Sequence, residues 1–101
     1  MPAHRKPYSK GSQVRRVKRL INAARPSLPD NPTPEEMTWL KHAEGVTALL
    51  VRIKRTKSIH GNTWVKSMLT YYTPRLTVLL DCAPRRMHDV ARHYAGWVTG
   101  L

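Results

Sequence analysis

Residues 33–57, TPEEMTWLKHAEGVTALLVRIKRTK, contain the clearest helix start in the chain. Thr33 is the expected N-cap, Pro34 the first helical residue and Glu36 the third. This T-x-x-E pattern predicts a capping box, in which each of the two side chains accepts a hydrogen bond from the other residue's backbone N–H. Proline is harmless at the first helical position because its missing N–H would have no helical partner there. We therefore predict that a long helix begins at Pro34.

An apolar stripe runs along this predicted helix. Its members are spaced by 4, 3, 4 and 3 positions, which places them on one side of a helix: Trp39, Ala43, Val46, Leu50 and Ile53. Leu40 and Leu49 widen the stripe. Such a face must be buried, so we expect it to form the core or the contact surface of a homodimer.

The balance of charge limits the kinds of partner. Eighteen Lys and Arg against six Asp and Glu give a formal net charge of +12. Such an excess repels itself unless a polyanion is near. Nucleic acid, an anionic membrane surface and an acidic protein all fit such a chain, and we favour nucleic acid.

The sequence also indicates the compartment. No apolar run reaches the roughly 18 residues that a membrane span needs, and the first residues do not resemble a secretory signal. The single cysteine, Cys82, cannot form an intramolecular disulfide, which fits a reducing compartment. We expect a cytoplasmic or nuclear protein that is not secreted.

Three segments follow one another along the chain. We expect residues 1–25 to be a basic N-terminal arm with a short amphipathic helix, which is stable only when docked or bound to an anion. Residues 26–34 contain four prolines and form a stiff, extended connector. Residues 35–101 are the expected helical domain.

Two further helical stretches are expected in the second half. One begins near Asn62 or Thr63, and Pro74 either kinks it or ends it. Because Thr73-Pro74 repeats the cap-then-proline pattern, a new helical segment should follow through Leu80, with a short buried strand as the alternative. A last helix begins near Pro84. The predicted fold is all-α, a small bundle of three or four helices with a basic, partly flexible N-terminal arm.

Clustered cations are the candidate phosphate-binding groups. One or two cations would complement the dipole of a helix C-terminus, whereas more than that repel each other. The candidate nucleic-acid-binding residues are Arg15, Arg16, Lys18, Arg19, Lys41, Arg52, Lys54, Arg55, Lys57 and Lys66. Lys41, Ala48, Arg52 and Arg55 share one line opposite the apolar stripe, where small side chains between cations would let a phosphate backbone approach closely.

Most aromatic residues lie on the apolar stripes and are expected in the core. Tyr8 and Tyr71 are the two expected to be free to stack on unpaired bases.

Catalytic and metal-binding patterns are not apparent. His88 and His93 are five residues apart, about 140° round a helix, so they do not readily share an ion. We find no nucleophile with a base and an orienting group, and no glycine-rich phosphate loop. We therefore expect no cofactor, no metal and no enzymatic activity.

The sequence predicts a small helical protein that contacts nucleic-acid phosphates. We prefer RNA to DNA, in double-stranded and sequence-independent form, because the charge spreads along the chain instead of concentrating on one recognition helix. In architecture alone, the expected fold is similar to the helical RNA-silencing suppressors of nodaviruses, a resemblance that implies paired helices laid along double-stranded RNA. The alternatives are a small viral or phage inhibitor that docks on an acidic host protein, and a ribosome-associated RNA-binding protein.

Overall fold

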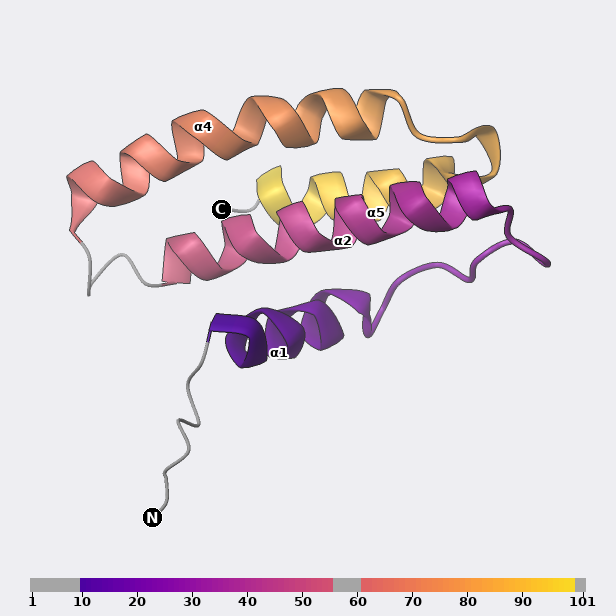
Figure 1. The fold of residues 1–101 in the computed structure, drawn as a ribbon, viewed down its shortest axis with the longest axis horizontal. Helices are drawn as coiled ribbons and strands as arrows, with labels where there is room; N and C mark the ends of the chain where they lie inside the picture. Colours follow the sequence, from indigo (N-terminus) through magenta and orange to yellow (C-terminus); the bar gives the residue numbers. More distant parts are fainter. Residues whose placement is uncertain (1–9, 56–60, 100–101) are drawn as a thin grey trace, which may run out of the picture.

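The computed structural model of the protein describes residues 10–55 and 61–99 (Figure 1). Within these ranges the chain forms four α-helices, one 3₁₀ turn and no strand. The elements are α1 (Lys10–Asn22), α2 (Pro34–Arg55), α4 (Asn62–Asp81), η1 (Arg85–Met87) and α5 (His88–Thr99). The prediction of a small all-α bundle is confirmed.

Helix α2 is the central element, because α1, α4 and α5 all contact it. It runs antiparallel to α1 and α4, which lie on either side of it in Figure 1, and in the same direction as α5. Its buried residues therefore point in several directions: Glu36, Trp39, Leu40, Ala43, Thr47, Ala48, Leu50, Val51 and Ile53. Four residues of the predicted stripe, Trp39, Ala43, Leu50 and Ile53, are buried within the single chain, and Val46 is half-buried, so a homodimer through that stripe would have to open the core.

The predicted capping box starts α2. The backbone N–H of Glu36 donates to Thr33 Oγ1 over 3.1 Å, and the backbone N–H of Thr33 donates to Glu36 Oε1 over 2.8 Å. These bonds satisfy two of the backbone N–H groups that a helix start leaves without a partner. The predicted helix start is confirmed.

Helix α1 is docked on the bundle. Val17 and Ile21 belong to the same buried cluster as Ala48 and Val51 of α2, and Ile21 is fully buried. At its C-terminal end, His93 of α5 is hydrogen-bonded to the carbonyl oxygen of Ile21. Packing against two helices therefore stabilises a segment that would be marginal alone.

Helix α4 passes through Pro74 without ending. The prediction that a new segment starts at Thr73-Pro74 is wrong, as is the alternative of a strand. Proline in a helix interior removes one backbone hydrogen bond and disturbs the preceding turn. Near Pro74, Arg75 donates a side-chain bond to the carbonyl of Tyr71, and Thr77 donates one to that of Thr73. The carbonyl that Pro74 leaves without a backbone donor is that of Thr70, so these side-chain bonds lie beside the lost hydrogen bond and do not replace it.

The C-terminal helix begins close to the predicted position. Pro84 precedes η1, which leads directly into α5. Met87, Val90 and Tyr94 are buried, whereas Arg92 and His88 are exposed.

The indole N–H of Trp39 donates to the carbonyl of Leu79 over 2.8 Å, which ties the end of α4 to the first half of α2. No helix in the described ranges is both long and apolar enough to cross a membrane.

Candidate nucleic-acid interface

The start of α1, the end of α2 and the start of α4 lie at one end of the bundle, and α5 ends on the same side (Figure 1, left). Two contacts nearer the opposite end set the register, namely Asn22 to Glu44 at 2.9 Å and Trp39 to Leu79. All α-helices rise by about 1.5 Å per residue, so equal numbers of residues counted from these contacts along antiparallel helices reach the same height along the bundle axis. Counted in this way, Arg15 of α1 and Lys66 of α4 both lie close to the height of Arg52 of α2.

We call the cations of this half of the bundle the basic end. Its members are Arg15, Arg16, Lys18 and Arg19 of α1, Arg52, Lys54 and Arg55 of α2, and Lys66 of α4. Residues 45–80 contain no acid, and neither do residues 1–29. The basic end is therefore positive without any internal counter-charge from these segments.

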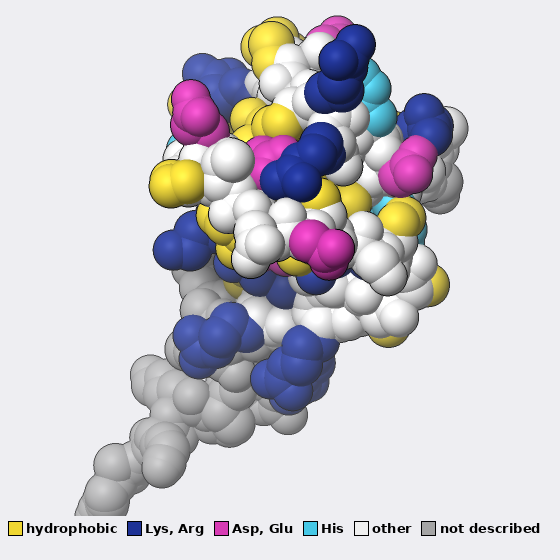
Figure 2. All heavy atoms as spheres, turned by 90° about the vertical axis from the view of Figure 1, so that its right-hand side faces the viewer, with side chains coloured by type: hydrophobic (Ala, Val, Ile, Leu, Met, Phe, Trp, Pro, Cys, Tyr) yellow, Lys and Arg dark blue, Asp and Glu magenta, His cyan; other side chains and the backbone are white. Residues whose placement is uncertain are grey.

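The acids lie elsewhere. Figure 2 shows the opposite end of the bundle, where acidic side chains are interspersed with Lys and Arg. In the lower part of the view, over α1, the coloured charged side chains are Lys and Arg. Five acids belong to the segments that meet at this opposite end: Asp30, Glu35, Glu36, Asp81 and Asp89. The sixth, Glu44, forms an ion pair with Arg25 at 2.7 Å. The molecule thus has an electrostatic polarity that favours one orientation toward a polyanion.

The cations of the basic end are accessible. Arg15, Arg16, Arg19, Arg55 and Lys66 are exposed, while Lys18, Arg52 and Lys54 are half-buried. Among the described residues, Arg25 pairs with Glu44, Arg86 with Glu36 and Arg92 with Asp89, and these three pairs do not include the exposed cations Arg15, Arg16, Arg19, Arg55 and Lys66.

At the basic end the N-termini of α1 and α4 lie on the same side as the C-termini of α2 and α5, so the helix dipoles largely cancel, and only the acids of the first turns follow the polarity. Helices α1 and α4 start at the basic end and have no acid in their first turn, and Gly61 caps α4 without a side-chain hydrogen bond. Helices α2 and α5 start at the other end and have acids in their first turns. The partial positive charge of a helix N-terminus is therefore left uncompensated by acids only at the basic end.

One predicted phosphate-binding line is wrong. Ala48 is fully buried, as is its neighbour Thr47, because α1 covers the side of α2 that lies opposite the stripe. The small side chain of Ala48 serves close helix packing, not the approach of a phosphate. Lys41 is exposed, but it lies eleven residues before Arg52, about 16 Å along the helix. Lys57 and Tyr8 lie outside the described residues.

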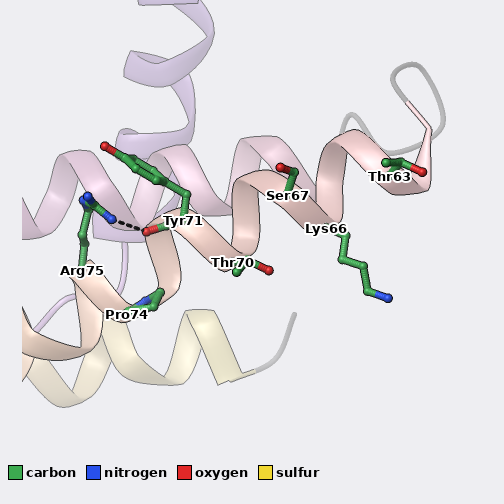
Figure 3. A pocket seen from close by; sticks show the side chains of 7 residues that line it. All are labelled: Thr63, Lys66, Ser67, Thr70, Tyr71, Pro74 and Arg75. Atoms are coloured by element: carbon green, nitrogen blue, oxygen red, sulfur yellow. Dashed lines mark hydrogen bonds between the residues drawn. The ribbon is translucent and has the colours of Figure 1, made fainter.

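A second feature adjoins the basic end. Along the outer face of α4 runs a shallow groove of about 660 Å³ lined by Thr63, Lys66, Ser67, Thr70, Tyr71, Pro74 and Arg75 (Figure 3). Tyr71 is 50% exposed, as the sequence predicted for a free aromatic. The guanidinium carbon of Arg75 lies 3.6 Å from the centre of the Tyr71 ring. Sequence inspection did not single out Arg75, although its i,i+4 spacing from Tyr71 was a usable signal.

The remaining polar cluster is structural. Tyr94 is buried; its hydroxyl donates to Asn22 Oδ1 over 2.8 Å and accepts from Arg25 over 3.2 Å. Burial raises the pKa of Tyr94, so the phenol stays protonated.

Trp39 is also buried, in agreement with its predicted core position. The described residues include no group of three His, Cys, Asp or Glu placed to hold a metal ion.

Comparison with known proteins does not identify a relative. No family model matches the chain, and neither a curated protein nor a solved structure matches it.

Proposed function

We propose that the protein binds RNA through its phosphate backbone at the basic end and has no catalytic activity. The observation that carries this proposal is the gathering of eight cations from three helices at one end of the bundle, in segments that contain no acid. Lys and Arg side chains on a surface without counter-charge are typical of contacts that position a protein on a polyanion.

A long polyanion fits this surface better than a small anion does. The principal extents of the molecule are 45 × 35 × 21 Å, and the basic end draws on helices from both sides of α2. A nucleic-acid strand places phosphates about 3.4 Å apart along a duplex axis. Several phosphates can therefore be contacted together, which a free phosphate or a single nucleotide does not allow.

The arrangement of helices favours recognition of shape over readout of bases. Helix α2 is surrounded and cannot enter a major groove, and α2 and α4 run antiparallel instead of crossing at the roughly 90–120° of a helix-turn-helix unit. A-form RNA is recognised mainly by its shape, its phosphates and its 2′-hydroxyls. We therefore infer sequence-independent binding with duplex RNA preferred to duplex DNA.

Fluorescence anisotropy with labelled duplex RNA, duplex DNA and single-stranded RNA tests this proposal. The expected result is tightest binding to duplex RNA of any sequence, with an affinity that falls steeply as salt is raised from about 50 to 200 mM. Absence of binding to all three at micromolar protein and about 50 mM salt would refute it. The basic end would then fit an acidic protein surface better.

A further inference from the structure

The groove on α4 carries a stacking platform. The guanidinium carbon of Arg75 lies 3.6 Å from the centre of the Tyr71 ring, and Arg75 donates a hydrogen bond to the carbonyl oxygen of Tyr71 over 2.7 Å. The ring of Tyr72 meets that of Tyr71 edge-on, with 4.8 Å between their centres. Tyr71 and Arg75 are therefore held as one unit, and half of the Tyr71 surface remains exposed. Aromatic rings and guanidinium planes are the groups on which proteins stack unpaired bases.

Two cations stand at a distance from each other in the groove. Lys66 lies near one end and Arg75 near the other (Figure 3). Nine residues separate them, which corresponds to about 13.5 Å along a helix. One phosphate cannot contact both cations at that distance. Because nine residues also turn a helix by about 180°, Lys66 lies on the other side of the groove from Tyr71 and Arg75 (Figure 3), so a strand that contacts both cations must cross the outer face of α4 obliquely.

The rest of the lining is neutral and can donate hydrogen bonds. Thr63, Ser67 and Thr70 are exposed, and their hydroxyls make no hydrogen bond to the described residues. Helix α4 has no acid before Asp81. Hydroxyls of this kind can bond phosphate oxygens or ribose hydroxyls without adding charge.

We propose that the α4 groove binds an unpaired RNA segment next to the duplex whose phosphates lie on the basic end, with one base stacked on the Tyr71–Arg75 unit. This inference rests on the proposed function, because Lys66 belongs to both surfaces and joins them. A paired base keeps its faces inside the duplex stack, so only an unpaired nucleotide can present one to the ring. The preferred RNA is accordingly a duplex with a single-stranded extension.

Binding of a blunt RNA duplex and of the same duplex with a single-stranded extension, labelled with a fluorescent base analogue, tests the inference. The extension should tighten binding by about 5-fold to 150-fold, the range that stacking of one base contributes, and the analogue should be quenched. Tyr71→Ala should reduce the ratio of the two affinities to about one, whereas Tyr71→Phe should retain it because the ring is kept. Val78→Ala, at an exposed position of the same helix, is the control and should leave the ratio as it is.

The outcomes separate this inference from the proposed function. If the unsubstituted protein binds both duplexes equally, or if Tyr71→Ala leaves the ratio of the two affinities unchanged, the inference about the groove is overturned while the proposed function stands. Failure of both duplexes to bind would overturn the proposed function and the groove with it. Arg75→Lys keeps the charge but loses the planar group, so a reduced ratio in this variant supports stacking over simple attraction.

Discussion

Arg86 holds Glu36 through two parallel hydrogen bonds, Nε to Oε2 at 3.0 Å and Nη2 to Oε1 at 2.7 Å. The same guanidinium donates to the carbonyl oxygens of Asp30 and Asn31. The carboxylate of Glu36 also completes the capping box with Thr33. One arginine therefore ties the connector, the start of α2 and the start of the last helical segment together. Arg86 therefore has a structural role in the fold.

This arrangement predicts a dependence of stability on pH. The hydrogen bonds from Arg86, followed by that from the Thr33 backbone, lower the pKa of Glu36 to about 2 from an ordinary 4.5. A carboxylate with a lowered pKa stabilises the fold above its unfolded pKa, and this contribution is lost as the pH falls. The thermal midpoint should therefore decline between pH 4.5 and about 2.

The substitution Glu36→Gln should lower stability at neutral pH and flatten this decline. Glu35→Gln, at an exposed neighbouring position, is the control and should keep the slope of the unsubstituted protein. Thermal unfolding followed by circular dichroism across the acid range measures both. Superimposable slopes for all three proteins would contradict the role given to Glu36.

Thr47 offers a stabilising substitution. Thr47 is fully buried, and its hydroxyl has no hydrogen-bond partner among the residues that the structure describes. A buried hydroxyl without a partner destabilises the fold by roughly 1–3 kcal/mol, so Thr47→Val should raise the free energy of unfolding by about 1 kcal/mol. Thr38→Val, at an exposed site of the same helix, should change it by less than about 0.5 kcal/mol. Urea denaturation measures the free energy of unfolding of both variants. A lower value for Thr47→Val than for the unsubstituted protein would show that the hydroxyl is hydrogen-bonded.

Two adjacent residues of α1 test whether this helix belongs to the core. Ile21 is fully buried and Leu20 is 43% exposed. Ile21→Ala should lower the free energy of unfolding by about 2–5 kcal/mol, because it leaves a cavity between α1 and α2. Leu20→Ala should cost much less. Equal, small effects in chemical denaturation would mean that α1 does not contribute to the fold.

The sequence predicts where helices form more reliably than how they pack against one another. The capping box at Thr33 and Glu36 determines the start of α2 locally, so it was predictable. The burial of Ala48 was not, because helical periodicity identifies one apolar face and cannot show that a second helix covers the opposite one. The prediction that a new segment starts at Pro74 was wrong for a related reason. Packing of α4 on α2 favours a helix that continues through the proline.

The candidate interface was predictable in part. The acid-free stretch from residue 45 to residue 80 is visible in the sequence. That Arg15 lies level with Arg52 and Lys66 depends on the antiparallel order of the helices, which no local pattern contains. The stacking of Arg75 on Tyr71 follows from their helical spacing and could have been inferred once α4 was known to continue through Pro74.

The central claim, that RNA is bound at the basic end, is tested most directly by two matched double variants. Arg15→Gln with Arg55→Gln removes two exposed cations of the basic end, and Arg85→Gln with Arg92→Gln removes two exposed cations of the opposite end. Both pairs lower the net charge equally. We predict that the first pair weakens binding to duplex RNA and lowers the slope of log affinity against log salt by roughly 1.8, about 0.9 for each lost phosphate contact. The second pair should leave that slope nearly unchanged, and an equal loss from both pairs would contradict the account.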